Sequence, residues 1–251
     1  SNPFVFIGII SLISSLVLSF VFVSTKDKVD SNKKLDIMKN VLLCRYLEDY
    51  EKHQEKLADP DNIEKEYNKA IEQVLYYEDG TLVSEELDFA KLEWKENKSD
   101  GSMYFFFKSN PDVKYLPLFR VKDDNGYIVP VSGKGLWSTL KGFLYVSKDL
   151  KEIKGISFYS HLETPGLGGE IDKPEVKKRY IDKSIDFSGA DVVVAKMVKS
   201  PKDGNNFELQ YMSGATITSD GLNYFIKRDL NKYKDILLCE SDSTKCKGNK
   251  E

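Results

Sequence analysis

The stretch LPLFRVKDDNGYIVPV, residues 116–131, contains two short β-rich runs on either side of a turn signal. The runs 116–121 and 127–131 are rich in β-branched and aromatic residues, and Asn125-Gly126 lies between them. An Asn-Gly pair favours the left-handed backbone of a tight β-turn. The stretch therefore predicts an antiparallel hairpin.

Further β-rich runs flank this hairpin along the chain. They lie at 104–108, 143–147, 155–160, 191–198 and 207–212, and the last two enclose the turn signal Pro201-Lys202-Asp203-Gly204. This arrangement predicts a second hairpin from the runs 191–198 and 207–212. Strands that are joined by short turns favour a largely antiparallel sheet.

Apolar residues at helical spacing precede the strands. They predict one helix over 35–50 and a second that runs from Ile63 through Val74 and ends at Asp79-Gly80. The segment Asp59-Pro60-Asp61 separates the two helices.

A last helix is expected after Thr218, with Thr218 or Ser219 as its N-cap and Asp220 in its first turn. The apolar residues Leu222, Phe225, Ile226 and Leu230 would form its buried face. The polar tail 240–251 is expected to be loose.

The N-terminal run FVFIGIISLISSLVLSFVFV, residues 4–23, has 20 residues and no charge. At 1.5 Å per residue, such a helix spans about 30 Å, which is the thickness of a bilayer's hydrocarbon core. The apolar region of a signal peptide has only about 7–15 residues before a small-residue cleavage site. The run therefore predicts a single transmembrane helix. Lysines and aspartates are mixed just after it, so charge leaves its orientation open.

Composition limits the chemistry that the chain can carry. It has 251 residues, 37 Lys+Arg against 40 Asp+Glu, and a formal net charge of −3. The 41% of hydrophobic residues exclude wholesale disorder, and the interspersed charges give no basic surface for nucleic acid. Three cysteines and two histidines are too few for a disulfide framework, an iron–sulfur cluster or a multi-histidine metal centre. No metal site is predicted, and demanding chemistry must come from a bound group.

One segment that could carry chemistry is SGATIT, residues 213–218, a small-residue turn before the last helix. The N–H groups at a helix N-terminus favour a phosphate. Gly214 and Ala215 leave room for a ligand to approach the hydroxyl of Thr216. An ordinary strand-to-helix turn rich in capping residues has the same pattern, so the pattern alone leaves both interpretations open.

Two glycine-containing segments lie upstream. LETPGLGGE, residues 162–170, permits close approach of the backbone to a flat or anionic ligand, but it lacks the third glycine of a dinucleotide fingerprint. VPVSGKGLWS, residues 129–138, lacks the spacing of a phosphate-binding P-loop. Trp137 in this segment is either a core residue or an aromatic wall for a ring system.

Taken in order, GKGLW, ETPGLGGE and SGATITS resemble the NqrC family, a component of the sodium-translocating NADH:quinone reductases. They are also similar to the sister family, RnfG of the Rnf electron-transport complexes. The resemblance covers about 116–232. The unbroken runs VSGKGLWS and HLETPGLGGE, residues 131–138 and 161–170, favour the first family.

The resemblance implies an FMN that is esterified through its phosphate to Thr216 by a separate, magnesium-dependent flavin transferase acting on FAD. It implies that the flavin is bordered by Ser213, Gly214, Ala215, Leu136, Trp137, Glu163, Thr164, Leu167, Gly168 and Gly169. It further implies partner subunits of a membrane respiratory complex, including redox subunits. The soluble domain would lie on the periplasmic side of the bacterial inner membrane. No catalytic acid, base or nucleophile is required of the chain, because the flavin's own electronics carry the reaction.

One departure from the family pattern is Gln210, which stands where the family has an aspartate three residues before the motif's serine. If that carboxylate helps the transferase to position its magnesium, modification of this chain is slower or uses an adapted transferase. The acceptor hydroxyl and its small neighbours are intact, so attachment is still expected.

The remaining reactive side chains are expected to be structural. Cys44 is predicted to be a buried thiol, and His53 and His161 are predicted to be surface or structural residues. Cys239 and Cys246 can pair if the tail lies in an oxidising compartment, or they can stay free.

The expected organisation is α+β, with a largely antiparallel twisted sheet flanked by helices and preceded by one N-terminal transmembrane helix. Its expected parts are the transmembrane helix 4–23, a helical neck and connecting segment 24–100, an FMN-binding domain 101–238 and a flexible tail 239–251. A second interpretation keeps the anchor but makes the domain a non-redox binding module, in which the glycine-rich loops only shape a surface.

Overall fold

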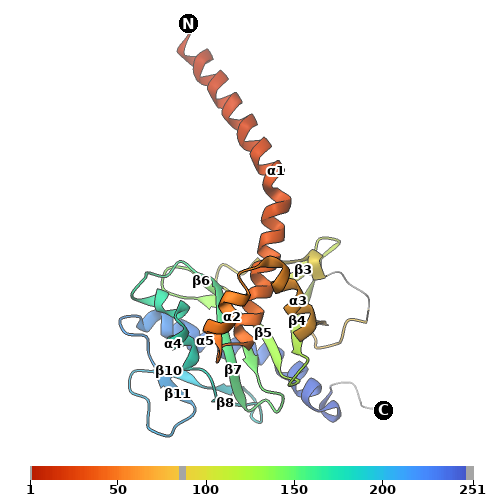
Figure 1. The fold of residues 1–251 in the computed structure, drawn as a ribbon, viewed down its shortest axis with the longest axis vertical. Helices are drawn as coiled ribbons and strands as arrows, with labels where there is room; N and C mark the ends of the chain where they lie inside the picture. The colour runs from red at the N-terminus through yellow and green to blue at the C-terminus, as the bar shows by residue number, and fades with distance from the viewer. Residues whose placement is uncertain (1, 85–88, 247–251) are drawn as a thin grey trace. The chain divides into compact units, whose positions relative to one another are not determined.

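The computed structural model describes residues 2–84 and 89–246, and the chain divides into two compact units, Ser1–Ile37 and Met38–Glu251. Helix α1 (Pro3–Arg45) begins in the first unit and ends in the second (Figure 1). Its part Pro3–Lys26 is long and apolar enough to cross a membrane. The side chains of Phe4 and Leu18 are 82% and 76% exposed, as is typical of a helix whose apolar surface faces lipid on all sides. The predicted N-terminal apolar helix is confirmed.

The second unit contains the remaining elements. Its helices are α2 (Tyr50–Lys56), α3 (Pro60–Ala70), α4 (Pro174–Lys178) and α5 (Thr216–Ser241), with 3-10 turns η1 (Phe89–Lys91), η2 (Gly168–Asp172) and η3 (Ser243–Lys245). Its strands are β1 (Ile71–Tyr77), β2 (Leu92–Glu96), β3 (Met103–Phe107), β4 (Asn110–Val121), β5 (Tyr127–Lys134), β6 (Thr139–Val146), β7 (Glu152–Ser160), β8 (Lys183–Asp186), β9 (Val193–Val194), β10 (Lys196–Val198) and β11 (Glu208–Gln210).

Within the described residues, nine strands form one antiparallel sheet in the order β2-β3-β4-β5-β6-β7-β8-β9, and β1 pairs with the long strand β4. The predicted hairpin is confirmed: Arg120 pairs with Tyr127, and Asn125 has a φ of 57° in the connecting turn. The α+β class with a largely antiparallel sheet is confirmed as well.

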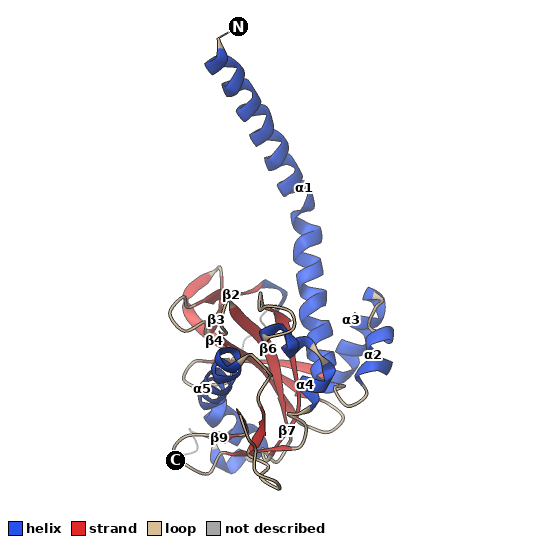
Figure 2. Cartoon of the chain, turned by 90° about the vertical axis from the view of Figure 1, so that its left-hand side faces the viewer, coloured by secondary structure: helices blue, strands red, loops and turns tan. Residues whose placement is uncertain are grey.

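Helices cover both faces of the central strands (Figure 2). On one face, α5 packs on β5, where Asp229 Oδ2 accepts a hydrogen bond from the backbone N–H of Ser132 at 2.8 Å. On the other face, the last turns of α1 pack on β6 and β7. The Ser157 hydroxyl donates to the carbonyl of Asn40 at 2.8 Å, and the buried Cys44 thiol donates to the carbonyl of Phe143 at 3.4 Å. The prediction of a buried Cys44 is confirmed.

The second predicted helix is wrong beyond Ala70. Helix α3 ends there, and Ile71 begins strand β1, which pairs with β4 from Ile71 opposite Val121 to Tyr77 opposite Tyr115. Val74, read as part of the helical repeat, is buried because it faces the sheet's core. Local spacing could not distinguish a helix from a strand here, since pairing with residues 38–50 positions away in the chain decides the conformation.

The predicted hairpin from 191–198 and 207–212 is also wrong. Strand β10 pairs with β11 in parallel, with Met197 opposite Leu209. Gly204 does adopt a positive φ of 74°, as expected in a turn. The link between the two strands is long enough, however, for the chain to return before β11 begins, so both strands run in one direction.

Helix α5 starts earlier and ends later than predicted. It begins at Thr216, so Thr218 and Ser219 lie in its first turn and are not its cap, and Asp220 falls beyond that turn. At the other end, Glu240 belongs to α5 and not to a loose tail. Its carboxylate accepts hydrogen bonds from the guanidinium of Arg120, at 2.6 and 2.7 Å, and from the hydroxyl of Tyr76. These long-range partners make the helix end part of the folded unit.

The last described residues are held by a disulfide between Cys239 and Cys246, so the paired alternative applies. Residues 247–251 of the predicted tail lie outside the described residues.

The contact between α1 and β7 requires a residue without a side chain. A Cβ added at Gly155 would lie 1.9 Å from the carbonyl oxygen of Cys44. We expect Gly155→Ala to lower the free energy of unfolding by about 1–3 kcal/mol, because overpacking forces the backbones apart. Lys154→Ala is the matched control: its exposed ion pairs with Glu152 and Asp182 contribute at most about 1 kcal/mol. Thermal unfolding of both variants measures the difference, and equal losses would contradict the assigned contact.

Candidate functional site

The GKGLW segment forms a tight turn between β5 and β6. The backbone N–H of Gly135 donates to the carbonyl of Ser138 at 2.8 Å and closes the turn. Leu136 and Trp137 at its tip are 46% and 70% exposed. The core interpretation of Trp137 is therefore wrong, because the backbone of this turn, and not its side chains, faces the protein interior.

The carboxylate of Glu163 holds the inner side of this turn. Its Oε1 accepts hydrogen bonds from the N–H groups of Trp137 and Ser138 at 2.9 and 3.1 Å, and its Oε2 accepts one from Leu136 at 3.2 Å. The hydroxyl of Thr218, in the first turn of α5, also donates to Oε2 at 2.7 Å. Glu163 is only 5% exposed. We call this arrangement the Glu163 clamp, and it joins all three predicted segments.

Hydrogen bonds decide the charge of the clamp. Burial by itself raises the pKa of the Glu163 carboxyl, since a charge is costly away from water. The hydrogen bonds from Thr218 and the turn's backbone favour the ionised form and outweigh burial, so the pKa lies below its ordinary value. Glu163 is therefore a buried carboxylate near neutral pH.

Glycines make room for the clamp in the ETPGLGGE segment. A Cβ added at Gly168 would lie 2.6 Å from both Glu163 Oε2 and the Thr218 hydroxyl. The N–H groups of Leu167 and Gly169 donate to the carbonyl of Thr164 at 3.1 and 2.9 Å, which closes the loop. Thr164 itself is exposed, so the side of the loop opposite the clamp faces solvent.

The SGATIT segment presents hydroxyls in two directions. Gly214 has a φ of 70°, and a Cβ there would lie 2.7 Å from Leu167 Cδ2, so this segment touches the ETPGLGGE loop. Ala215 is buried, whereas Ser213 and Thr216 are exposed. Thr218 is only 1% exposed. The two threonines of the segment therefore differ: one faces solvent and the other faces the clamp.

Thr216 is the first residue of α5, and the preceding Ala215 has a methyl side chain that cannot accept a hydrogen bond. The first N–H groups of a helix have no partner within the helix and carry a partial positive charge. An anion attached at Thr216 would lie beside these groups.

All three segments also expose apolar side chains at the surface. Their exposed fractions are large: Leu136 46%, Trp137 70%, Leu162 82%, Leu167 43% and Ile217 58%. We call these five residues the apolar rim. Such a surface suits a flat aromatic ligand that is covered by protein on one side.

Three residues with clear roles were missed as site residues by sequence reasoning. Thr218 donates to the clamp, Ser138 accepts the N–H of Leu162 at 2.7 Å through its hydroxyl, and His161 accepts the N–H of Glu163 at 3.2 Å. The only sequence signal for these residues was that each lies in or next to one of the three motifs. Their contacts with one another form only in the fold. Gln210, noted as a departure, donates its side-chain amide to the carbonyl of Lys199.

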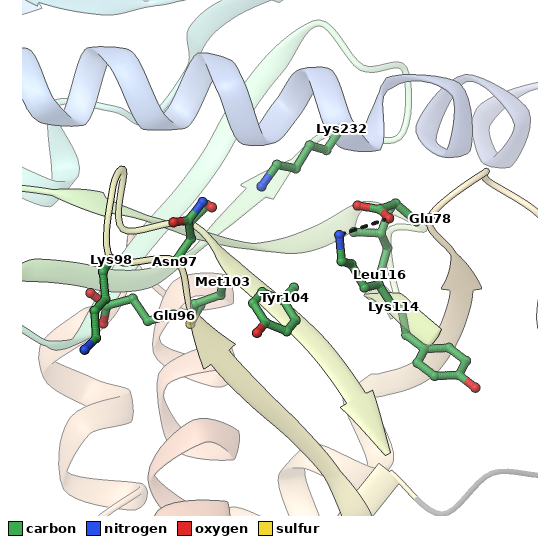
Figure 3. A pocket seen from close by; sticks show the side chains of 11 residues that line it. Glu78, Glu96, Asn97, Lys98, Met103, Tyr104, Lys114, Leu116 and Lys232 are labelled. Carbon is green, nitrogen blue, oxygen red and sulfur yellow. Dashed lines mark ion pairs between the residues drawn. The ribbon is translucent and has the colours of Figure 1, made fainter. Parts of the chain in front are cut away.

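A separate hollow lies between α5 and the strands β2, β3 and β4 (Figure 3). Lys232 reaches into it from α5, opposite Tyr104, and Lys114 forms an ion pair with Glu78 at 3.6 Å on its far side. Its lining residues, all in the described part of the chain, include none of the predicted site residues. The predicted site is instead an open surface.

Comparisons with known proteins support the same region. A family model, the FMN-binding domain, matches residues 135–231, a range that contains every predicted site residue. The chain is 29% identical to the NqrC protein of the Na(+)-translocating NADH-quinone reductase of Haemophilus ducreyi, over 90% of this chain and 88% of that protein. It is 36% identical to the NqrC protein of Pseudomonas aeruginosa, over 47% of this chain and 48% of that protein.

Solved structures of NqrC proteins share the fold. The one from Parabacteroides distasonis has a TM-score of 0.60 and 26% identity, and the match covers 85% of this chain and 94% of that one. NqrC of Shewanella oneidensis has a TM-score of 0.55 and 23% identity, with coverage of 75% and 90%, and bears on the fold alone.

The clamp makes a testable contribution to stability. We expect Glu163→Gln to lower the free energy of unfolding by about 2 kcal/mol near neutral pH, because a neutral amide accepts fewer and weaker hydrogen bonds. The folded-state pKa is depressed, so the carboxylate's contribution is complete above the ordinary value of 4.5 and is lost as pH falls through the folded-state pKa. The difference in unfolding free energy between Glu163→Gln and the unchanged protein should therefore disappear at low pH.

Denaturant unfolding at several pH values measures this gap. Glu170→Gln is the control, because its carboxylate pairs with Lys173 at the surface and contributes little. A gap for Glu163→Gln that does not change with pH would show that shape, and not charge, matters at this position.

Proposed function

The chain is a homologue of the NqrC proteins of Na(+)-translocating NADH-quinone reductases with an FMN-binding domain, and we propose that it is a membrane-anchored flavoprotein that relays electrons within such a complex. FMN would be attached covalently to Thr216. The electron-carrying partners would be other redox subunits of the same membrane complex.

The observation that carries the proposal is the exposed hydroxyl of Thr216 at the surface of the matched domain. Thr218 is occupied by its hydrogen bond to Glu163, so its hydroxyl is not free to react. Ser213 is exposed, but it lies before the helix and further from the N–H groups of the first turn. Thr216 combines exposure with the position that best favours a phosphate.

The surrounding residues fit the cofactor. Gly214 and Ala215 place no bulky side chain next to Thr216, and the apolar rim would offer a wall for one side of an isoalloxazine ring. FMN, when bound, supplies reversible uptake of one or two electrons. The chain's residues would position that ring: Trp137 and Leu136 would flank it, and Glu163 fixes the turn that carries them.

The proposed attachment would be a phosphoryl transfer. The Thr216 oxygen would form a bond to the phosphorus of the FMN half of FAD, the pyrophosphate bond would break, and AMP would leave while the hydroxyl proton is lost. A flavin transferase with bound magnesium would supply the catalytic groups. The helix N-terminus stabilises the phosphodiester charge that remains.

Two features support a single-pass anchor with the domain on the periplasmic side. Pro3–Lys26 has the length and polarity of a membrane span. The disulfide Cys239–Cys246 suits an oxidising compartment, as the periplasm is. An anchor of this kind raises the effective concentration of the flavin near neighbouring membrane subunits.

The attachment site has a direct test. We expect Thr216→Ala, expressed with a competent flavin transferase, to give a band without flavin fluorescence on a denaturing gel. The unchanged protein should give a fluorescent band, and peptide mass mapping should place the modification on residue 216.

Two control variants separate attachment from folding. Ser213→Ala removes the other exposed hydroxyl and should keep the flavin, and Thr218→Ser keeps the clamp's hydroxyl and should also keep it. Flavin that persists in Thr216→Ala would refute the attachment site. A dark band for the unchanged protein would refute the flavoprotein.

The orientation has an independent test. A cysteine that replaces Asp203, in the exposed loop between β10 and β11, should react with a membrane-impermeant thiol reagent added to the periplasmic face. The native thiols stay silent, because Cys44 is buried and the other two are paired. Asn2→Cys, before the span, should react only after the membrane is opened. The reverse pattern would place the domain in the cytoplasm.

A further inference from the structure

His161 links the Glu163 clamp to a second carboxylate. Its Nε2 lies 2.8 Å from Asp172 Oδ2, and its Nδ1 lies 3.2 Å from the backbone nitrogen of Glu163. A backbone N–H can only donate, so Nδ1 must be the acceptor and Nε2 must carry the proton. These contacts select the neutral ring with hydrogen on Nε2.

The segment that His161 fixes is the one that holds the exposed turn. Directly after His161, the N–H of Leu162 donates to the Ser138 hydroxyl at 2.7 Å, and the Glu163 carboxylate binds the backbone of the turn. Leu136 and Trp137 move with that backbone. Two hydrogen bonds thus connect His161 Nδ1 to the tip of the turn: one to the backbone N–H of Glu163, and one from the turn to the Glu163 carboxylate.

A proton on Nδ1 cannot be accommodated without movement. It would place two donors face to face, the ring N–H and the N–H of Glu163, at a separation suited to one hydrogen bond. The bond would be lost, and the backbone at 162–163 must turn to relieve the contact. The two charge states of the ring therefore require two arrangements of this segment.

The charges around the ring bring protonation of His161 into an accessible pH range. The hydrogen bond to Asp172 raises the pKa of His161, burial opposes it, and the negative charges of Asp172 and Glu163 raise it further. Lys177, from α4, lowers it. The net result is a pKa above the ordinary value of 6.5.

We propose that His161 is a positioning residue for the turn at 136–138, which is locked when the ring is neutral and released when Nδ1 is protonated. The part of this inference that concerns the flavin rests on the proposed function. Coupling between two sites is reciprocal. Negative charge placed over the turn, as on a reduced ring, would therefore favour a proton on His161.

The coupling can be measured without any flavin. The full chain with Thr216→Ala and Trp94→Phe has Trp137 as its single tryptophan, since the sequence contains two. We expect its fluorescence to change in one titration between about pH 5 and 9, with a midpoint above 6.5. His161→Gln should abolish the change, and Asp172→Asn should move its midpoint to lower pH.

The second histidine supplies the matched control. His53 lies on α2, stacks on Tyr46 and makes none of the hydrogen bonds of the clamp, so His53→Gln should leave the titration of Trp137 unchanged. In that variant His161 is the only histidine, and its ring resonance in NMR gives its pKa directly. Its midpoint should equal that of the Trp137 fluorescence.

Two results would overturn the inference: a ring that titrates while Trp137 does not, or a Trp137 titration that survives His161→Gln. The Asp172→Asn shift keeps the test valid if His161→Gln fails to fold. In flavinylated protein, the flavin absorbance should titrate with the same midpoint. Failure of flavinylation would count against the proposed function alone, because the measurements on Thr216→Ala do not depend on it.

Discussion

The buried carboxylate of Glu163 is the constraint on which the site depends. An ionised group in a protein interior is tolerated only when hydrogen bonds replace its lost water. Glu163 obtains them from the 136–138 backbone and from the hydroxyl of Thr218, groups that are 25 to 55 residues away in the chain. Satisfying this one charge therefore brings a β-turn, a glycine-rich loop and a helix start together. The close approach also explains why Gly168 cannot carry a side chain.

The clamp also determines what faces outward. Because the N–H groups of the turn point at Glu163, the side chains of Leu136 and Trp137 are left in solvent. On α5, successive residues are about 100° apart around the helix axis, so residues two positions apart lie on nearly opposite faces. Thr218 faces the carboxylate, and Thr216 consequently faces away from it. Polar groups are thus drawn inward and apolar groups outward, which is the reverse of an ordinary surface loop and is suited to an aromatic ligand.

The sequence allowed prediction of features that are encoded locally. The hairpin at Asn125-Gly126 and the apolar N-terminal helix depend on residues next to one another, and both were confirmed. Strand β1, the parallel pairing of β10 with β11 and the start of α5 depend on partners distant in the chain, and these were missed or wrong. The same holds for the site: Glu163 and Thr216 were named through family resemblance. The role of Glu163 as a clamp could not be predicted, because its donors become neighbours only in the fold.

An open site of this kind would account for the proposed covalent link between FMN and Thr216. A helix N-terminus contributes about 0.3–1 kcal/mol to an exposed anion. Covering one side of an aromatic ring, about 150 Å² of apolar surface, adds about 4 kcal/mol. Association alone costs about 4–15 kcal/mol, so these contacts would leave a free flavin mostly dissociated. The proposed bond to Thr216 would remove that cost in every redox state and would leave the other side of the ring open. An electron carrier needs such access, whereas a deep pocket would shield the ring from its partners.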